Sequence, residues 1–119
     1  MAESFIFELD NRYHFSEPVL DRMLVSVTEA VNNGIVHGNK SNPEKSVDLS
    51  CNCYEDRIVF VVRDEGVGFV KEELPNPLAE ENLLKESGRG ILIIEHLMDT
   101  VEYLRTESGM ELTMMIYLR

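Results

Sequence analysis

The architecture of this chain depends on one run of sequence, residues 26–38, which reads Ser26-Val27-Thr28-Glu29-Ala30-Val31-Asn32-Asn33-Gly34-Ile35-Val36-His37-Gly38. Apolar residues recur there, and just before it, at every third or fourth position, as on the buried face of a helix: Leu20, Leu24, Val27, Val31 and Ile35. Glu29 and Asn33 lie one turn apart on the opposite face, in line with Arg22 and Ser26.

The pair formed by Glu29 and Asn33 has two interpretations. A carboxylate and a carboxamide held on a packed helix can offer a base and a neutral oxygen ligand to one small volume, which suits a Mg-nucleotide site. On an isolated helix, the same pair would be a solvated surface. The rest of the chain must therefore decide between the two.

Length and composition limit the class of protein. At 119 residues and 44% apolar content, the chain suits one compact domain over residues 1–119. Its longest apolar runs, 58–62 and 91–94, are far shorter than the ~18 residues that a membrane-spanning helix needs. Residues 1–4 lack the basic start of a secretory signal. We therefore expect a cytoplasmic protein with no membrane partner.

The charge of the chain bears on its partners. The formal net charge of −11 argues against direct binding to nucleic acid, which depends on Lys and Arg at the phosphates, and favours a basic protein partner. A polyanionic ligand would have to be held by backbone N–H groups, a bound cation and a few local basic residues.

The N-terminal half predicts a strand, a helix and a hairpin. Alternating apolar residues over 5–9 predict a short first strand, and the stretch from Glu17 to His37 predicts a helix that ends at Gly38. Strands are expected over 46–53 and 57–63, with a tight turn between them. The second of these strands is nearly all apolar and is expected at the centre of the sheet. In the first, Cys51 and Cys53 are expected to be small buried thiols on one face.

The C-terminal half predicts a lid, a second helix and two closing strands. Residues 70–87 contain Pro75-Asn76-Pro77 and are long enough for a mobile lid that orders around a ligand. A helix is expected over 91–98, with strands over 100–104 and 110–118. The fold class is α/β, as an α+β two-layer sandwich whose mixed, mainly antiparallel sheet is covered on one face by helices.

Two glycine motifs follow the first helix. Asp64, Gly66 and Gly68 can place a carboxylate acceptor and close-lying backbone beside an adenine, although a plain turn would look similar. Gly88 and Gly90 precede a helix, whose free N–H groups favour anions, although an ordinary N-terminal loop is the alternative.

Taken in order, these motifs carry a resemblance to a known superfamily. Glu29-x-x-x-Asn33-x-x-x-His37-Gly38, then Asp64-x-Gly66-x-Gly68-Phe69, then Ser87-Gly88-Arg89-Gly90 resemble the N box and the two glycine boxes of the GHKL ATPases. Within that superfamily, the segment 64–99 is similar to the bacterial anti-sigma-factor serine kinases of RsbW type. The resemblance implies a GHKL, or Bergerat-type, ATP-binding fold.

The resemblance also implies a role for each motif residue. Glu29 would be the general base, and Asn33 would bind the nucleotide through Mg²⁺. Asp64 would bind adenine, and the glycines and Arg89 would line the nucleotide: Gly66 and Gly68 at the base and ribose, and Gly88, Arg89 and Gly90 at the phosphates.

The implied activity is that of an ATP-dependent protein serine kinase acting as an anti-sigma factor, with ATP or ADP and Mg²⁺ as cofactors. Such a protein sequesters a sigma factor and phosphorylates a small antagonist, and a homodimer is among the assemblies that the resemblance allows. One alternative is a nucleotide-gated partner-binding module with little or no kinase activity. Another is the catalytic piece of a two-component sensor.

Two features depart from the family's pattern. The pair Gly-Thr that usually precedes the last strand is absent from residues 109–113. A helix generally lies between the family's first strand and its N-box helix, whereas only residues 10–15 separate those two elements as predicted here.

Overall fold

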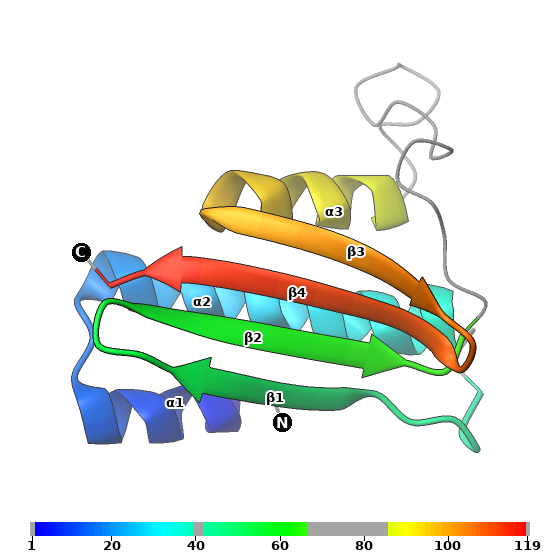
Figure 1. Cartoon of the computed structure of the whole chain (residues 1–119), viewed down its shortest axis with the longest axis horizontal. Helices are drawn as coiled ribbons and strands as arrows, with labels where there is room; N and C mark the ends of the chain where they lie inside the picture. Colours follow the sequence, from blue (N-terminus) through cyan, green and yellow to red (C-terminus); the bar gives the residue numbers. More distant parts are fainter. Residues whose placement is uncertain (1, 40–41, 67–85, 119) are drawn as a thin grey trace.

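The computed structural model describes residues 2–39, 42–66 and 86–118. Its elements in chain order are α1 (Ala2–Tyr13), α2 (Glu17–Asn33), the π-helical turn η1 (Gly34–Gly38), β1 (Asp48–Cys53), β2 (Arg57–Asp64), α3 (Glu86–Leu97), β3 (Thr100–Thr106) and β4 (Gly109–Tyr117) (Figure 1). The four strands form one sheet in the order β1-β2-β4-β3. Every pairing between these described strands is antiparallel.

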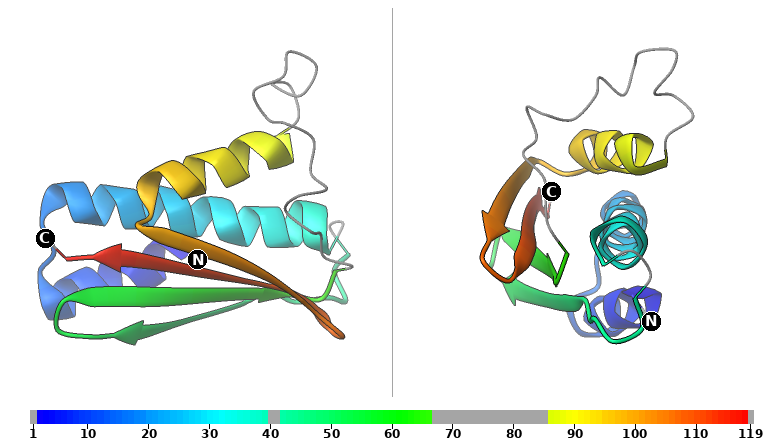
Figure 2. Two further views of the ribbon diagram at one scale, coloured as in Figure 1. Left: turned by 45° about the horizontal axis from the view of Figure 1, so that its top comes forward. Right: turned by 90° about the vertical axis from the view of Figure 1, so that its right-hand side faces the viewer.

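The fold has two layers. Figure 2 shows α1, α2 and α3 on one side of the sheet. Side chains from alternate positions of β2 and β4 face these helices and form the core; Phe60 pairs with Met114, and both are 0% exposed. The predicted α+β sandwich with a mainly antiparallel sheet is therefore confirmed, and β2 lies at its centre as predicted.

The predicted strand over 5–9 is wrong, because these residues belong to α1. The side chains that reach the core are Ala2, Phe5, Ile6 and Leu9, which is the spacing of one helix face. Phe7, which the alternation placed beside Phe5 and Leu9, is 49% exposed. A helix thus does precede the N-box helix, and the described part of the chain contains no strand before it.

The predicted helix over 17–37 is confirmed, but its buried stripe and its end differ. The most deeply buried apolar residues are Val19, Met23, Val27 and Ala30, one position earlier than most of the predicted stripe. The last turn widens into η1, where the Asn39 N–H bonds to the Gly34 carbonyl, five residues back, at 2.8 Å. In η1 the predicted core residue Ile35 is 42% exposed.

The remaining elements lie near their predicted positions. β1 and β2 form the predicted hairpin, and β3 and β4 form the second. The second helix begins earlier than predicted, at Glu86, so the glycine motif at 88–90 lies inside its first turns rather than before it. No helix within the described ranges is both long and apolar enough to cross a membrane.

The two cysteines are free thiols on the core side of β1, as predicted, although each is half-buried rather than fully buried. Burial, with a smaller effect of the neighbouring Cys53, raises the pKa of Cys51 from 9.0 to about 11. Cys51 is therefore protonated at neutral pH.

Candidate functional site

The elements that carry the predicted motifs meet at one end of the molecule. The C-terminal ends of α2 and β2, the N-terminal end of α3 and the β3–β4 turn all lie there in Figure 1, and both views of Figure 2 agree. The arrangement follows from the antiparallel course of α2 and α3, which pack along each other above the sheet.

Glu29 and Asn33 of α2 face Gly90 of α3 across this junction. A Cβ atom on Gly90 would lie 2.8 Å from Nδ2 of Asn33 and 2.8 Å from Oε2 of Glu29. A side chain at position 90 would therefore collide with both, and only glycine allows this approach without a shift. The structure thus brings together three of the predicted site residues from two separate motifs.

The carboxamide oxygen of Asn33 has no hydrogen-bond partner in the part of the chain that the structure describes, although it is buried. Buried polar atoms are nearly always paired in native proteins, so an unpaired acceptor at a predicted site is a candidate ligand atom. A neutral oxygen suits Mg²⁺, which commonly takes one or two protein ligands and completes its shell with water and phosphate oxygens. Asn33 therefore fits the metal role that the resemblance implies.

Asp64, the last residue of β2, lies beside the residue that follows Asn33. A Cβ atom on Gly34 would lie 3.4 Å from the Cβ of Asp64 and 3.1 Å from a methyl group of Val47. The Asp64 carboxylate accepts a hydrogen bond of 2.8 Å from the Gly66 N–H, which closes a local turn. Asp64 and Gly66 are therefore next to the junction of α2 and α3, which is necessary if both motifs are to contact the same ligand.

Gly109 lies at the candidate site, in a contact with Asp64 that sequence reasoning missed. It has a φ of +153°, and a Cβ atom there would lie 1.9 Å from the carbonyl oxygen of Asp64. Thr106 donates a hydrogen bond of 3.0 Å from its hydroxyl to the Gly109 carbonyl and holds the turn. Residues 109–113, where the family's Gly-Thr pair is absent, therefore begin with a glycine that packs against the end of β2. The signal in the sequence was its place just before the strand predicted over 110–118, at residues 109–113, where the family usually has its Gly-Thr pair.

Asn39 was missed as well. It is 3% exposed, and it accepts a hydrogen bond of 2.7 Å from the Glu65 N–H and donates one of 3.0 Å to the Ser46 carbonyl. The sequence places Asn39 directly after Gly38, where we expected no more than the end of a helix. Its side chain instead joins three segments next to Asp64.

The remaining predicted site residues are Gly68, Gly88 and Arg89. Gly68 and most of the predicted lid lie outside the described residues, which resume at Glu86. Gly88 and Arg89 lie in the first turn of α3, where backbone N–H groups have no partner within the helix. These N–H groups are at the same end of the molecule as Asp64 and Asn33.

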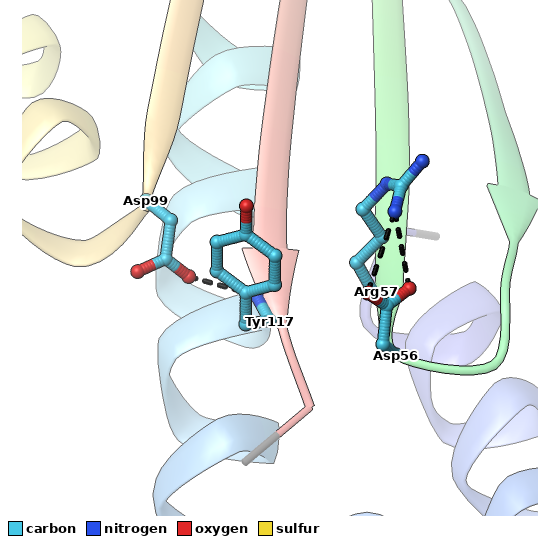
Figure 3. A network of polar contacts seen from close by, with 4 residues as sticks. All are labelled: Asp56, Arg57, Asp99 and Tyr117. Atoms are coloured by element: carbon cyan, nitrogen blue, oxygen red, sulfur yellow. Dashed lines mark hydrogen bonds and ion pairs between the residues drawn. The ribbon is translucent and has the colours of Figure 1, made fainter.

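At its other end, α3 is held by Arg22, seven residues before Glu29 in α2. The Arg22 Nε donates a hydrogen bond of 2.7 Å to the Leu97 carbonyl, and its guanidinium lies 3.6 Å from the Asp99 carboxylate. Asp99 also accepts a hydrogen bond of 2.7 Å from the Tyr117 N–H (Figure 3).

Between the two ends of α2, Ser26 is 0% exposed, which shows that this face of α2 is buried rather than solvated.

Comparisons with known proteins identify the family and the relatives of the chain. A family described as the histidine kinase-like ATPase domain matches residues 2–116. The chain is 38% identical over 104 residues to the anti-sigma F factor of Oceanobacillus iheyensis, an alignment that covers 83% of this chain and 66% of that protein. It is 34% identical over 102 residues to the serine-protein kinase RsbW of Staphylococcus epidermidis, covering 80% of this chain and 64% of that protein.

The chain thus spans slightly less than two thirds of the length of these curated relatives. Among solved structures, the histidine kinase domain of the blue-light activated histidine kinase from Erythrobacter litoralis EL346 matches with a TM-score of 0.65 and 18% identity. That match covers 98% of this chain and 57% of the other, and at this identity it shows a shared fold.

Proposed function

Because the chain belongs to the histidine kinase-like ATPase domain family, we propose that it is a protein serine kinase that uses Mg-ATP and acts as an anti-sigma factor. In this proposal the protein sequesters a sigma factor and phosphorylates a small antagonist protein. The names of the relatives support it, since they include an anti-sigma F factor and a serine-protein kinase.

The observation that carries the proposal is the junction of Glu29, Asn33 and Gly90. The contact of Gly90 with both side chains brings the N box against the helix that opens with the last glycine motif. The unpaired, buried Oδ1 of Asn33 would bind Mg²⁺, and the ion would offset the charge of the phosphate oxygens. A solvated surface pair would show neither the contact nor the unpaired buried oxygen.

Base recognition is assigned to Asp64. Its carboxylate, held at the end of β2, would accept a hydrogen bond from the exocyclic amine of adenine, with Gly66 and Gly68 lining the base and ribose. Gly88, Arg89 and Gly90 would meet the phosphates, where N–H groups of the first turn of α3 add donors.

Glu29 would act as the general base. The hydroxyl oxygen of a serine on the antagonist attacks the γ-phosphorus of ATP, the bond from that phosphorus to the bridging oxygen breaks, and ADP leaves. The hydroxyl proton passes to the Glu29 carboxylate. The ends of the Glu29 and Asn33 side chains both lie 2.8 Å from a Cβ atom placed on Gly90, so in this proposal the proton acceptor and the phosphate end of the nucleotide share one volume.

The proposed partners fit the charge of the chain. A net charge of −11 favours a basic face on a protein partner over nucleic acid. Because sigma factors act on RNA polymerase, the proposed function also places the protein in the cytoplasm. The proposal includes no fixed oligomeric state, and the mass of the protein in solution would show whether it forms a homodimer.

The second candidate function is a nucleotide-gated module that binds partners but transfers phosphate poorly. The absence of the family's Gly-Thr pair from residues 109–113 favours it. Gly109 is occupied by its contact with the backbone of Asp64, and Glu111 pairs with Arg63 at 3.0 Å, so residues 109–111 are engaged in the sheet. Neither contact contributes to a phosphate site.

A transfer assay separates these functions. The purified protein is incubated with γ-labelled ATP, Mg²⁺ and candidate antagonist proteins, with Glu29→Gln as the matched variant. Label on an antagonist serine, absent with the variant, supports the kinase. Nucleotide binding without transfer to any antagonist supports the module, and failure to bind adenine nucleotide refutes both.

A further inference from the structure

Asn39 owes its position to the π-helical turn. Its N–H bonds to the Gly34 carbonyl five residues back, and the wider turn ends the helix with this side chain pointing inward, only 3% exposed. A polar side chain so deeply buried needs hydrogen-bond partners, and the oxygen and the nitrogen of the Asn39 carboxamide each have one.

The partners of Asn39 form a closed ring of three residues. Asn39 accepts from the Glu65 N–H at 2.7 Å and donates to the Ser46 carbonyl at 3.0 Å. The Glu65 carboxylate in turn accepts a hydrogen bond from the Ser46 N–H. The ring therefore ties the end of η1 to the segment that enters β1 and the segment that leaves β2.

Asp64 is the residue that this ring holds in place. It directly precedes Glu65, whose N–H belongs to the peptide group that the two residues share. The carbonyl oxygen of that same peptide group lies against Gly109, so the peptide is fixed by Asn39 on its N–H side and by Gly109 on its oxygen side. The backbone that carries the Asp64 carboxylate has little freedom to rotate.

We propose that Asn39 is a positioning residue that fixes Asp64 and thereby sets the preference of the site for adenine over guanine. The inference rests on the proposed function, in which Asp64 binds the exocyclic amine. Guanine presents a carbonyl oxygen at that position, and a fixed carboxylate opposes it. A carboxylate that can move away penalises guanine less, so loss of Asn39 lowers selectivity as well as affinity.

Two variants of Asn39 separate its two hydrogen bonds. Asn39→Ala removes both and leaves the Glu65 N–H unpaired. Asn39→Asp keeps an acceptor for that N–H but cannot donate to Ser46. The matched control is Asn42→Ala in the same loop, because the Asn42 side chain is exposed and accepts a local hydrogen bond of 2.9 Å from the Glu44 N–H, while its backbone hydrogen bonds are kept in the variant.

The measurement is the affinity of the full chain for ATP and for GTP, by calorimetry with Mg²⁺. We expect Asn39→Ala to lose on the order of tenfold in ATP affinity, as for one well-placed hydrogen bond, and to bind GTP nearly as before. Asn39→Asp should lie between Asn39→Ala and the parent, and Asn42→Ala should equal the parent. A parent-like ratio of ATP to GTP affinity in Asn39→Ala would overturn the inference.

A second readout needs no nucleotide. Hydrogen exchange at the Glu65 amide should be slow in the parent and in Asn42→Ala and fast in Asn39→Ala. A parent that binds no ATP refutes the proposed function, and with it the selectivity role, even if this amide responds. If Asn39→Ala does not fold, the same comparison is made between Asn39→Asp and Asn42→Asp, and an unchanged nucleotide ratio there again overturns the inference.

Discussion

Arg22 and Leu97 join the two long helices at the end remote from the candidate site, through a hydrogen bond of 2.7 Å from the Arg22 Nε to the Leu97 carbonyl. Leu97 is the last residue of α3, where carbonyl groups lack partners within the helix and a positive charge is favourable. Arg22 therefore fixes α3 along α2, while Gly90 fits against Glu29 at the opposite end.

Replacing Arg22 with alanine should lower the free energy of unfolding by about 1–2 kcal/mol, since a charged donor to a helix-terminal carbonyl is lost. The control is Arg63→Ala, which breaks the Arg63–Glu111 ion pair of 3.0 Å, in which the Arg63 side chain is 51% exposed. Such a surface pair contributes about 0–1 kcal/mol. Urea unfolding of both variants tests this. Equal losses in the free energy of unfolding would show that the Arg22–Leu97 hydrogen bond stabilises the fold no more than the surface ion pair does.

Gly90→Ala should stabilise the protein less than the usual trend for a helix interior. In the interior of an exposed helix, alanine is favoured over glycine by about 1 kcal/mol. Here the added methyl group would lie 2.8 Å from side-chain atoms of Glu29 and Asn33. The two side-chain ends must move aside, so we expect Gly90→Ala to stabilise more in a Glu29→Ala/Asn33→Ala background than in the parent. An equal effect in both backgrounds, measured by urea unfolding, would contradict the contact.

Glu29→Gln should separate binding from phosphate transfer. The amide keeps the shape of the side chain but cannot accept the serine proton, and loss of a general base typically costs about 10²- to 10⁴-fold in rate. Nucleotide affinity should change little. Single-turnover transfer and calorimetry measure the two, with Glu8→Gln on the exposed side of α1 as the control. Equal transfer rates in the parent and Glu29→Gln would remove Glu29 from the mechanism.

Gly109→Ala should be the most damaging of these substitutions. The Cβ atom would lie 1.9 Å from the Asp64 carbonyl oxygen, and a φ of +153° is unfavourable for any residue with a side chain. We expect a loss of more than about 3 kcal/mol, or no folded protein. Ser108→Ala, in the same turn and exposed, should cost less than about 0.5 kcal/mol. Similar thermal unfolding of the two variants would disprove the close contact.

Cys51 should make the fold sensitive to alkaline pH. Its pKa is raised to about 11 in the folded protein from 9.0, so the folded state retains a proton that the unfolded state releases. This contribution to stability is complete below pH 9 and is lost as the pH rises toward 11. Urea unfolding at pH 8.5 and 10 should show a smaller decrease in Cys51→Ala than in the parent. An identical decrease in both would contradict the shift.

Most helices and strands could be predicted from the sequence, because the apolar pattern of each one lies within its own segment. The α2 helix and the strands were predicted from residues a few positions apart, and the stacking of Glu29 on Asn33 followed from the helix alone. The failure at 5–9 arose because so short a segment satisfies two periods: Phe5 and Leu9 fit a strand, but together with Ala2 and Ile6 they fit a helix face.

Contacts between distant segments were beyond sequence reasoning. Asn39 and Glu65 are 26 residues apart, and nothing in either neighbourhood predicts that one accepts the other's N–H. The same holds for Gly109 against Asp64. The motifs predicted which residues form the candidate site, whereas the close approach of their backbones depends on how α2, β2 and β4 pack.

The sheet order has a consequence for the kinetics of folding. β1–β2 and β3–β4 are local hairpins, but the central ladder joins β2 to β4 across all the intervening chain, including α3. Since closure of such a long loop is slow, this ladder should form late and limit the folding rate. Gly109 reaches Asp64 only when the ladder closes at its Asp64–Met110 pair. The proposed base-binding end of the site should therefore be absent from any earlier folding intermediate, and nucleotide should slow unfolding without accelerating folding.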